Sequence, residues 1–96
     1  MRDLPEILLI LRKHKNRLKD KYHLKSIEIF GSVSRKENLE QSDIDILIDY
    51  DMPIGIEFID LANELEEILK QKVDLVSKRG IKPKYYKEIE RDLTSV

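Results

Sequence analysis

The sequence predicts a small α/β (α+β) fold in which a mixed β-sheet is flanked by helices. Three observations favour it. The 96 residues suffice for one domain, three short segments alternate apolar and polar side chains as strands do, and amphipathic segments separate them. The expected element order is α-β-α-β-α-β-α, and we expect a single domain spanning residues 1–96.

The first predicted element is an amphipathic helix. Residues 6–22 carry apolar side chains at helical spacing, with basic side chains on the opposite face. Pro5 lies near the predicted start, where a helix tolerates proline. Residues 26–30 then alternate in character and indicate a strand.

Gly31 and Ser32 end this predicted strand, and polar sequence follows. Residues 32–37 are expected to form a short helix and residues 38–42 a polar loop. Residues 44–50 indicate the second strand, with isoleucines on one face and aspartates with one leucine on the other.

The second half of the chain is expected to add a helix, a strand and a helix. Residues 56–70 form a predicted amphipathic helix whose apolar side includes Ile59. Residues 73–76 indicate a short strand. Pro83 opens the last helix, which is expected to run to about residue 93.

Charge and composition exclude several classes of protein. The chain has 18 basic and 19 acidic residues, so its charge gives no strong nucleic-acid signal. The absence of cysteine excludes disulfides and thiolate metal sites. No apolar run reaches the ~18 residues of a membrane span, and the charged start lacks a signal-peptide core. We therefore expect a soluble cytoplasmic protein without a membrane partner.

Asp43 and Asp45 are the first candidate site residues. Side chains two residues apart on a strand share a face, with their Cα atoms ~6.6 Å apart. Two neighbouring carboxylates repel unless a cation neutralises them, and Mg²⁺ prefers carboxylate and phosphate oxygens. Such a pair also fits an ordinary solvent-facing strand, as Asp49 does in the same alternation.

Gly31, Ser32 and Asp74 strengthen the case for a site. A glycine at a strand end permits close backbone approach, and a following helix start can bind phosphate; a plain turn is the alternative. Asp74 interrupts an apolar strand, where burial of an unpaired charge is unfavourable. A metal or general-base role would explain it, and a surface-facing position on an edge strand is the alternative.

The combined motif resembles that of a known family. Gly-Ser-Val-Ser-Arg at residues 31–35 is followed, after six residues, by Ser-Asp-Ile-Asp at residues 42–45 and an apolar strand. This pattern is similar to the signature of the DNA polymerase β-type nucleotidyltransferase superfamily, and within it to the small, stand-alone minimal nucleotidyltransferases. The resemblance implies the polymerase β-like nucleotidyltransferase fold.

The resemblance also implies roles for the nucleotide-binding side chains. Gly31 and Ser32 would contact the β- and γ-phosphates of ATP, and Ser42 would belong to the same nucleotide-binding set. Arg35 would either neutralise phosphate or brace the loop through a structural salt bridge.

The acids would form the catalytic and metal-binding set. Asp43 and Asp45 would bind one or two Mg²⁺ ions. Asp74 would be the third acid, which activates an acceptor hydroxyl or helps to bind metal. Preorganised charge stabilisation and alignment would then supply most of the rate.

The implied function is AMP transfer from ATP to a protein. Members of the minimal group are commonly antitoxins encoded beside a HEPN-domain ribonuclease toxin, and the expected acceptor is a tyrosine of that toxin. The alternatives are a non-catalytic antitoxin that blocks its toxin by occupancy, and a nucleotidyltransferase acting on a small molecule or an RNA end. Tyr85, Tyr86 and Ile89 either dock the partner or pack in the core. The sequence leaves homo- or hetero-oligomers open.

Overall fold

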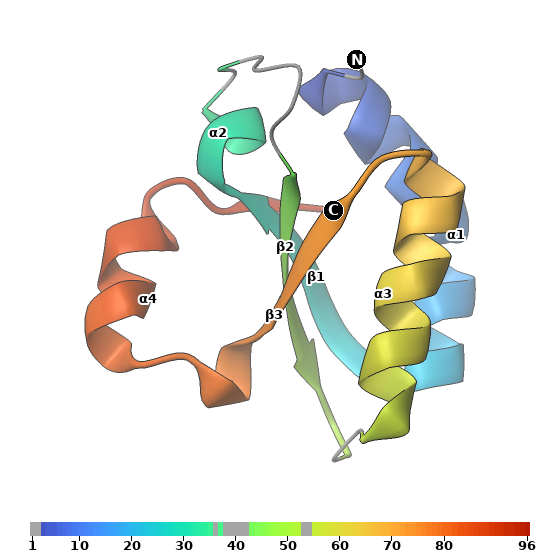
Figure 1. The fold of residues 1–96 in the computed structure, drawn as a ribbon. Coiled ribbons are helices and arrows are strands. Elements are labelled where there is room, and N and C mark those ends of the chain that lie inside the picture. Colours follow the sequence, from blue (N-terminus) through green and yellow to red (C-terminus); the bar gives the residue numbers. More distant parts are fainter. Residues whose placement is uncertain (1–2, 36, 38–42, 53–54) are drawn as a thin grey trace.

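A four-stranded mixed sheet forms the centre of the computed structural model, which describes residues 3–35, 37, 43–52 and 55–96 (Figure 1). The strand order is β3-β2-β1-β4. β1 is antiparallel to both β2 and β4, whereas β2 and β3 are parallel. The strands span Leu24–Phe30 (β1), Ile44–Tyr50 (β2), Val73–Ser77 (β3) and Thr94–Ser95 (β4).

Helices cover both faces of this sheet. They span Leu4–Tyr22 (α1), Gly31–Ser34 (α2), Ile56–Leu69 (α3), Lys78–Gly80 (the 3-10 helix η1) and Pro83–Glu90 (α4). In Figure 1, α1 and α3 lie on one face of the sheet, α4 lies on the other, and α2 continues from the end of β1. The sheet is thus sandwiched between two unequal helical layers.

The core divides along the same two faces. Ile46 and its alternate neighbours in β2 are fully buried in the larger cluster, which packs against α1 and α3. Phe30, Leu47 and Ile89 form a smaller cluster on the α4 side. Because side chains alternate across a strand, Asp45 shares the α4 face with Leu47. The candidate acids are therefore kept out of the main core.

The predicted fold class is confirmed, with differences at the element ends. The first helix and first strand each begin two residues earlier than expected, and α4 ends at Glu90 instead of about residue 93. Strand β4 was not predicted, because two residues give no periodicity and their pairing with β1 is long-range. The predicted loop at 38–42 lies outside the described residues.

One apolar position of α3 was assigned to the wrong side of the helix. Ile59 was expected on the apolar face, but its side chain is 63% exposed. Leu61 and Leu65 instead direct the buried face of α3 toward the sheet. No helix in the described part of the chain is both long and apolar enough to cross a membrane.

Candidate active site

Strand register brings the candidate acids to one end of the sheet. Asp45 is the parallel partner of Asp74 across β2 and β3. On its other side, Asp45 faces Phe30 of β1, directly before Gly31. Asp43 precedes β2 by one residue and is exposed. Three separate stretches of sequence thus meet around the Asp45 side chain.

Gly31 allows the closest of these approaches. Its φ angle is +75°, a left-handed conformation that L-residues with side chains rarely adopt. A Cβ atom added at Gly31 would lie 2.1 Å from Asp45 Oδ2. The carboxylate of Asp45 therefore lies directly against the Gly31 backbone, and only glycine leaves room for it.

The acids interact electrostatically. Burial raises the pKa of Asp45 to about 6, and the negative charges of Asp74 and Asp43, with a hydrogen bond to Asp74, act in the same direction. The positive charge of Arg35 acts in the opposite direction. Partial burial beside two further acids disfavours the ionised form of Asp45, and a nearby cation would favour it.

The carboxylates of the candidate site have the chemistry that a divalent metal requires. Oxygen donors concentrated around Gly31 suit Mg²⁺. Among the described residues, however, no three acidic or histidine side chains already converge on a metal-sized volume. Asp45 and Asp74 instead lie side by side as partners across the parallel strands β2 and β3. A shared cation would require their side chains to turn toward it.

Of the two alternatives for Asp74, burial is wrong and a surface-facing position on an edge strand is confirmed. Asp74 is exposed on β3, an edge strand. Solvent therefore reaches its carboxylate, and burial alone does not require a partner there. What sets Asp74 apart is its position beside Asp45, which follows from the register of two parallel strands.

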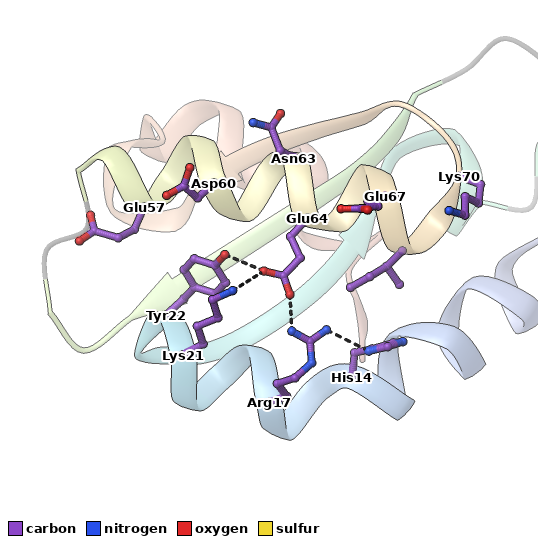
Figure 2. Close-up of a pocket in the computed structure, with 11 residues that line it drawn as sticks. His14, Arg17, Lys21, Tyr22, Glu57, Asp60, Asn63, Glu64, Glu67 and Lys70 are labelled. Carbon is purple, nitrogen blue, oxygen red and sulfur yellow. Dashed lines mark hydrogen bonds and ion pairs between the residues drawn. The ribbon is translucent and has the colours of Figure 1, made fainter.

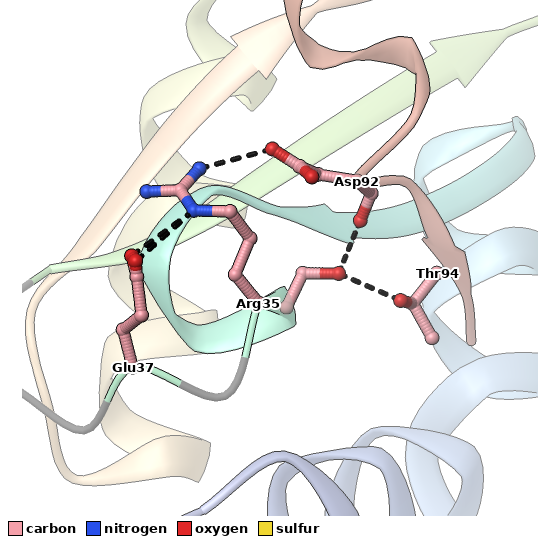
Figure 3. A network of polar contacts seen from close by, with 5 residues as sticks. Arg35, Glu37, Asp92 and Thr94 are labelled. Atoms are coloured by element: carbon pink, nitrogen blue, oxygen red, sulfur yellow. Dashed lines mark hydrogen bonds and ion pairs between the residues drawn. The ribbon is translucent and has the colours of Figure 1, made fainter.

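The remaining predicted nucleotide-binding residues have different environments. Ser32 is half-buried as the second residue of α2, and its carbonyl accepts a hydrogen bond from the Glu37 amide at 2.9 Å. Ser42 lies outside the described residues. Arg35 makes ion pairs with Asp92 at 2.9 Å and with Glu37 at 3.1 Å (Figure 3). The structure thus contains the brace that was one of the two predicted roles of Arg35.

Sequence reasoning missed a polar network behind α2. The Ser34 hydroxyl donates to the Asp92 carbonyl and lies 2.7 Å from the Thr94 hydroxyl (Figure 3). Because these contacts join positions about 60 residues apart, no local spacing or motif in the sequence predicts them. Their effect is to link the turn after β1 to the chain after α4.

A cleft of about 850 Å³ lies between α1 and α3 (Figure 2), and its lining does not include Asp43, Asp45 or Asp74. Glu64 of α3 projects into it and accepts hydrogen bonds from Tyr22 at 2.7 Å and Lys21 at 3.0 Å. It also pairs with Arg17. Burial favours a higher pKa of Glu64, but these donors outweigh it and lower the pKa to about 2. The cleft is therefore bridged by a satisfied network that joins two helices.

The last helix packs its apolar side inward. Ile89 is 8% exposed and belongs to the smaller core cluster, which Tyr86 also contacts. Tyr85 is 45% exposed. Core packing is therefore the role of Ile89, and Tyr85 is the exposed one of these three side chains.

A family model for the nucleotidyltransferase domain matches residues 11–95. The chain belongs to this nucleotidyltransferase family. The matched range contains Gly31, Ser32, Asp45 and Asp74. The predicted family and the prediction of an enzyme are confirmed.

Two archaeal relatives cover almost the whole nucleotidyltransferase. A Methanocaldococcus jannaschii protein, MJ0126, named as an inferred protein adenylyltransferase, is 55% identical over 97% of both chains. Protein adenylyltransferase MntA of Thermococcus cleftensis is 39% identical over 100% of this chain and 98% of its own.

Solved structures agree with this assignment. A protein described as a minimal nucleotidyltransferase has a TM-score of 0.83 at 30% identity, covering 99% of this chain and 97% of its own. A Shewanella oneidensis complex of a tri-AMPylated HEPN toxin with its MNT antitoxin gives a TM-score of 0.68 at 27% identity, covering 93% and 70%. A toxin–antitoxin structure with AMP-PNP gives 0.72 at 27% identity, covering 86% and 69%.

Proposed function

We propose that this nucleotidyltransferase transfers AMP from ATP to a tyrosine of a HEPN-type toxin and so acts as its antitoxin. The observation that carries the proposal is the contact of the Asp45 carboxylate with the Gly31 backbone, with Asp74 alongside. It joins a turn suited to phosphates and a set of acids in one place. Relatives named as adenylyltransferases and a neighbour with an AMPylated toxin support the same reaction.

In this proposal Mg²⁺ is held by Asp43 and Asp45, with Asp74 as a further ligand or as the base. The donor chemistry fits, because burial and the neighbouring charges of Asp74 and Asp43 raise the pKa of Asp45 to about 6, and a cation would offset that repulsion. When bound, the metal supplies neutralisation of phosphate charge. The residues themselves fix where the phosphates lie: Gly31 leaves backbone room, and Ser32 offers a hydroxyl and an amide.

The acceptor reaches the site from the open edge of the sheet. Asp74 is exposed on edge strand β3, so a tyrosine from a separate protein can approach it. The tyrosine oxygen forms a bond to the α-phosphorus, and the bond from that phosphorus to the oxygen bridging to the β-phosphate breaks. The hydroxyl proton passes to Asp74, and pyrophosphate leaves.

The proposal is tested by intact mass measurement. This chain is incubated with the HEPN-domain protein encoded beside it, ATP and Mg²⁺, and the mass and nuclease activity of that partner are followed. We expect the partner to gain AMP units on tyrosine while its nuclease activity falls, and chelation of divalent metal to stop both changes.

Two other outcomes favour the alternatives. Inhibition of the partner without any mass gain would favour a non-catalytic antitoxin that acts by occupancy. Transfer of AMP to an RNA end or a small molecule, with the partner unmodified, would place the chain among nucleotidyltransferases with another acceptor.

A further inference from the structure

Three side-chain contacts tie the short helix α2 to the chain after α4. The Ser34 hydroxyl donates to the Asp92 carbonyl and lies 2.7 Å from the Thr94 hydroxyl. Arg35 Nη1 contacts Asp92 Oδ2 at 2.9 Å (Figure 3). Asp92 therefore contacts two consecutive residues. Its backbone carbonyl accepts a hydrogen bond from Ser34, and its carboxylate pairs with Arg35.

The segment that supplies these contacts, residues 92–96 (the strap), is itself well anchored. Thr94 pairs with Ile29 of β1. The Val96 amide donates to the Ile27 carbonyl at 3.0 Å, and the Val96 side chain is only 6% exposed. The strap is thus fixed to the same strand that leads into α2.

Helix α2 needs outside support to keep its position. It has four residues, and Phe30, its N-cap residue, makes no side-chain capping hydrogen bond. A single helical turn is unstable by itself. Gly31 must also hold its left-handed conformation within contact of Asp45. Displacement of this turn is expected to weaken binding, because a binding site must be held within about 0.5 Å of its productive geometry by the residues around it.

We propose that Asp92 is a positioning residue, which holds the Gly31–Ser32 turn, through Ser34 and Arg35, in the geometry that receives the phosphates of ATP. Arg35 then acts as a tie to the strap and does not itself bind phosphate. Its guanidinium is already paired with two carboxylates, those of Asp92 and Glu37. This inference rests on the proposed use of ATP but not on the identity of the acceptor.

The test measures binding of Mg²⁺ and AMP-PNP by calorimetry in a double-mutant cycle. We expect Asp92→Asn and Arg35→Gln each to weaken AMP-PNP binding about fivefold. A loss of this size is what one partly exposed ion pair contributes. The double variant is expected to bind no more weakly than the weaker single variant, because both changes break one link. In the transfer assay, KM for ATP is expected to rise while kcat and the KM for the acceptor change less than twofold.

Two further variants separate positioning from general stability. Glu37→Gln removes the other carboxylate from Arg35 but leaves the link to the strap, so it is expected to bind AMP-PNP like the wild type. Ser34→Ala removes the second tie while preserving the Arg35–Asp92 pair, and is expected to weaken binding severalfold. Ser34→Ala still tests the proposal if Asp92→Asn does not fold. Asp92→Glu keeps the negative charge, and we expect it to bind AMP-PNP more tightly than Asp92→Asn does.

Specific results would overturn the inference. If the two single effects multiply in the double variant, Arg35 binds phosphate independently of Asp92. If Asp92→Asn and Ser34→Ala bind AMP-PNP as the wild type does, the strap does not position the turn, whatever the acceptor. Failure of the wild type to bind AMP-PNP would instead refute the use of ATP, and with it both proposals.

Discussion

At Gly31 the backbone occupies space that any other residue would fill. The left-handed φ and the 2.1 Å separation between an added Cβ and Asp45 Oδ2 act together. The first disfavours a side chain for conformational reasons, and the second would push the carboxylate away. This position joins the phosphate-binding and acidic parts of the proposed site.

Gly31→Ala is therefore expected to impair both stability and nucleotide binding. The strained conformation alone should lower the free energy of unfolding by about 1–3 kcal/mol, and displacement of Asp45 should abolish detectable transfer. Denaturant unfolding and the mass assay measure the two effects. Gly80→Ala is the matched control, because nothing lies within 4 Å of an added Cβ there. A fully active Gly31→Ala would contradict the close packing.

The sequence identified these residues but not how they meet. Spacing alone predicted that Asp43 and Asp45 share a region, and a glycine at a strand end predicted close backbone approach. That Asp74 aligns with Asp45 depends on strand register, and that Ser34 meets Asp92 depends on long-range packing. Neither contact can be predicted from local periodicity. The apolar neighbours of Asp74 suggested burial, whereas the structure has the alternative, a surface-facing position on an edge strand.

Among the elements, α1 and α3 are joined by polar contacts of Glu64. Its carboxylate accepts from Arg17, Lys21 and Tyr22, and these donors lower its pKa to about 2 from an ordinary 4.5. Because the folded-state pKa is depressed, ionised Glu64 stabilises the fold above about pH 4.5. That contribution is lost as pH falls from about 4.5 toward 2.

Glu64→Gln should lower the free energy of unfolding at pH 7 by about 1 kcal/mol, which corresponds to a Tm about 4–8 °C lower. The difference from the wild type should shrink as pH falls toward 2. Thermal unfolding across this pH range measures it. Glu67→Gln is the control, since Glu67 lines the same cleft but makes no ion pair among the described residues. An equal difference at every pH would show that ionisation of Glu64 does not stabilise the fold.

Helices and strands were predicted correctly where the apolar pattern extends over many residues. The long helices and β2 were predicted to within about two residues, because apolar spacing over many positions specifies them. β4 was missed because only two residues pair, and their partner strand lies 65 positions earlier at Ile29↔Thr94. The side chain of Ile59 was assigned to the buried face because it is apolar and close to helical spacing, but that face of α3 is formed by Leu61 and Leu65.

Across the whole molecule, stability depends on the isoleucine-rich face of the sheet. Ile29→Ala should lower the free energy of unfolding by about 2–5 kcal/mol, because the side chain is fully buried and its loss leaves a cavity. Ile59→Ala deletes the same atoms from a site that is 63% exposed and should change stability by no more than about 0.5 kcal/mol. Denaturant unfolding compares the two. Equal losses would contradict the assignment of the core.

We place AMP transfer at the Gly31–Asp45–Asp74 cluster. Comparison of two aspartates on one strand tests this placement most directly. Asp45 and Asp49 lie on the same face of β2, but only Asp45 contacts Gly31. Asp49 pairs with Arg79 instead. Intact mass of the HEPN partner after incubation with each variant, ATP and Mg²⁺ is the deciding measurement. We predict that Asp45→Asn transfers no AMP and that Asp49→Asn transfers it as the wild type does. Undiminished transfer by a folded Asp45→Asn would contradict the account.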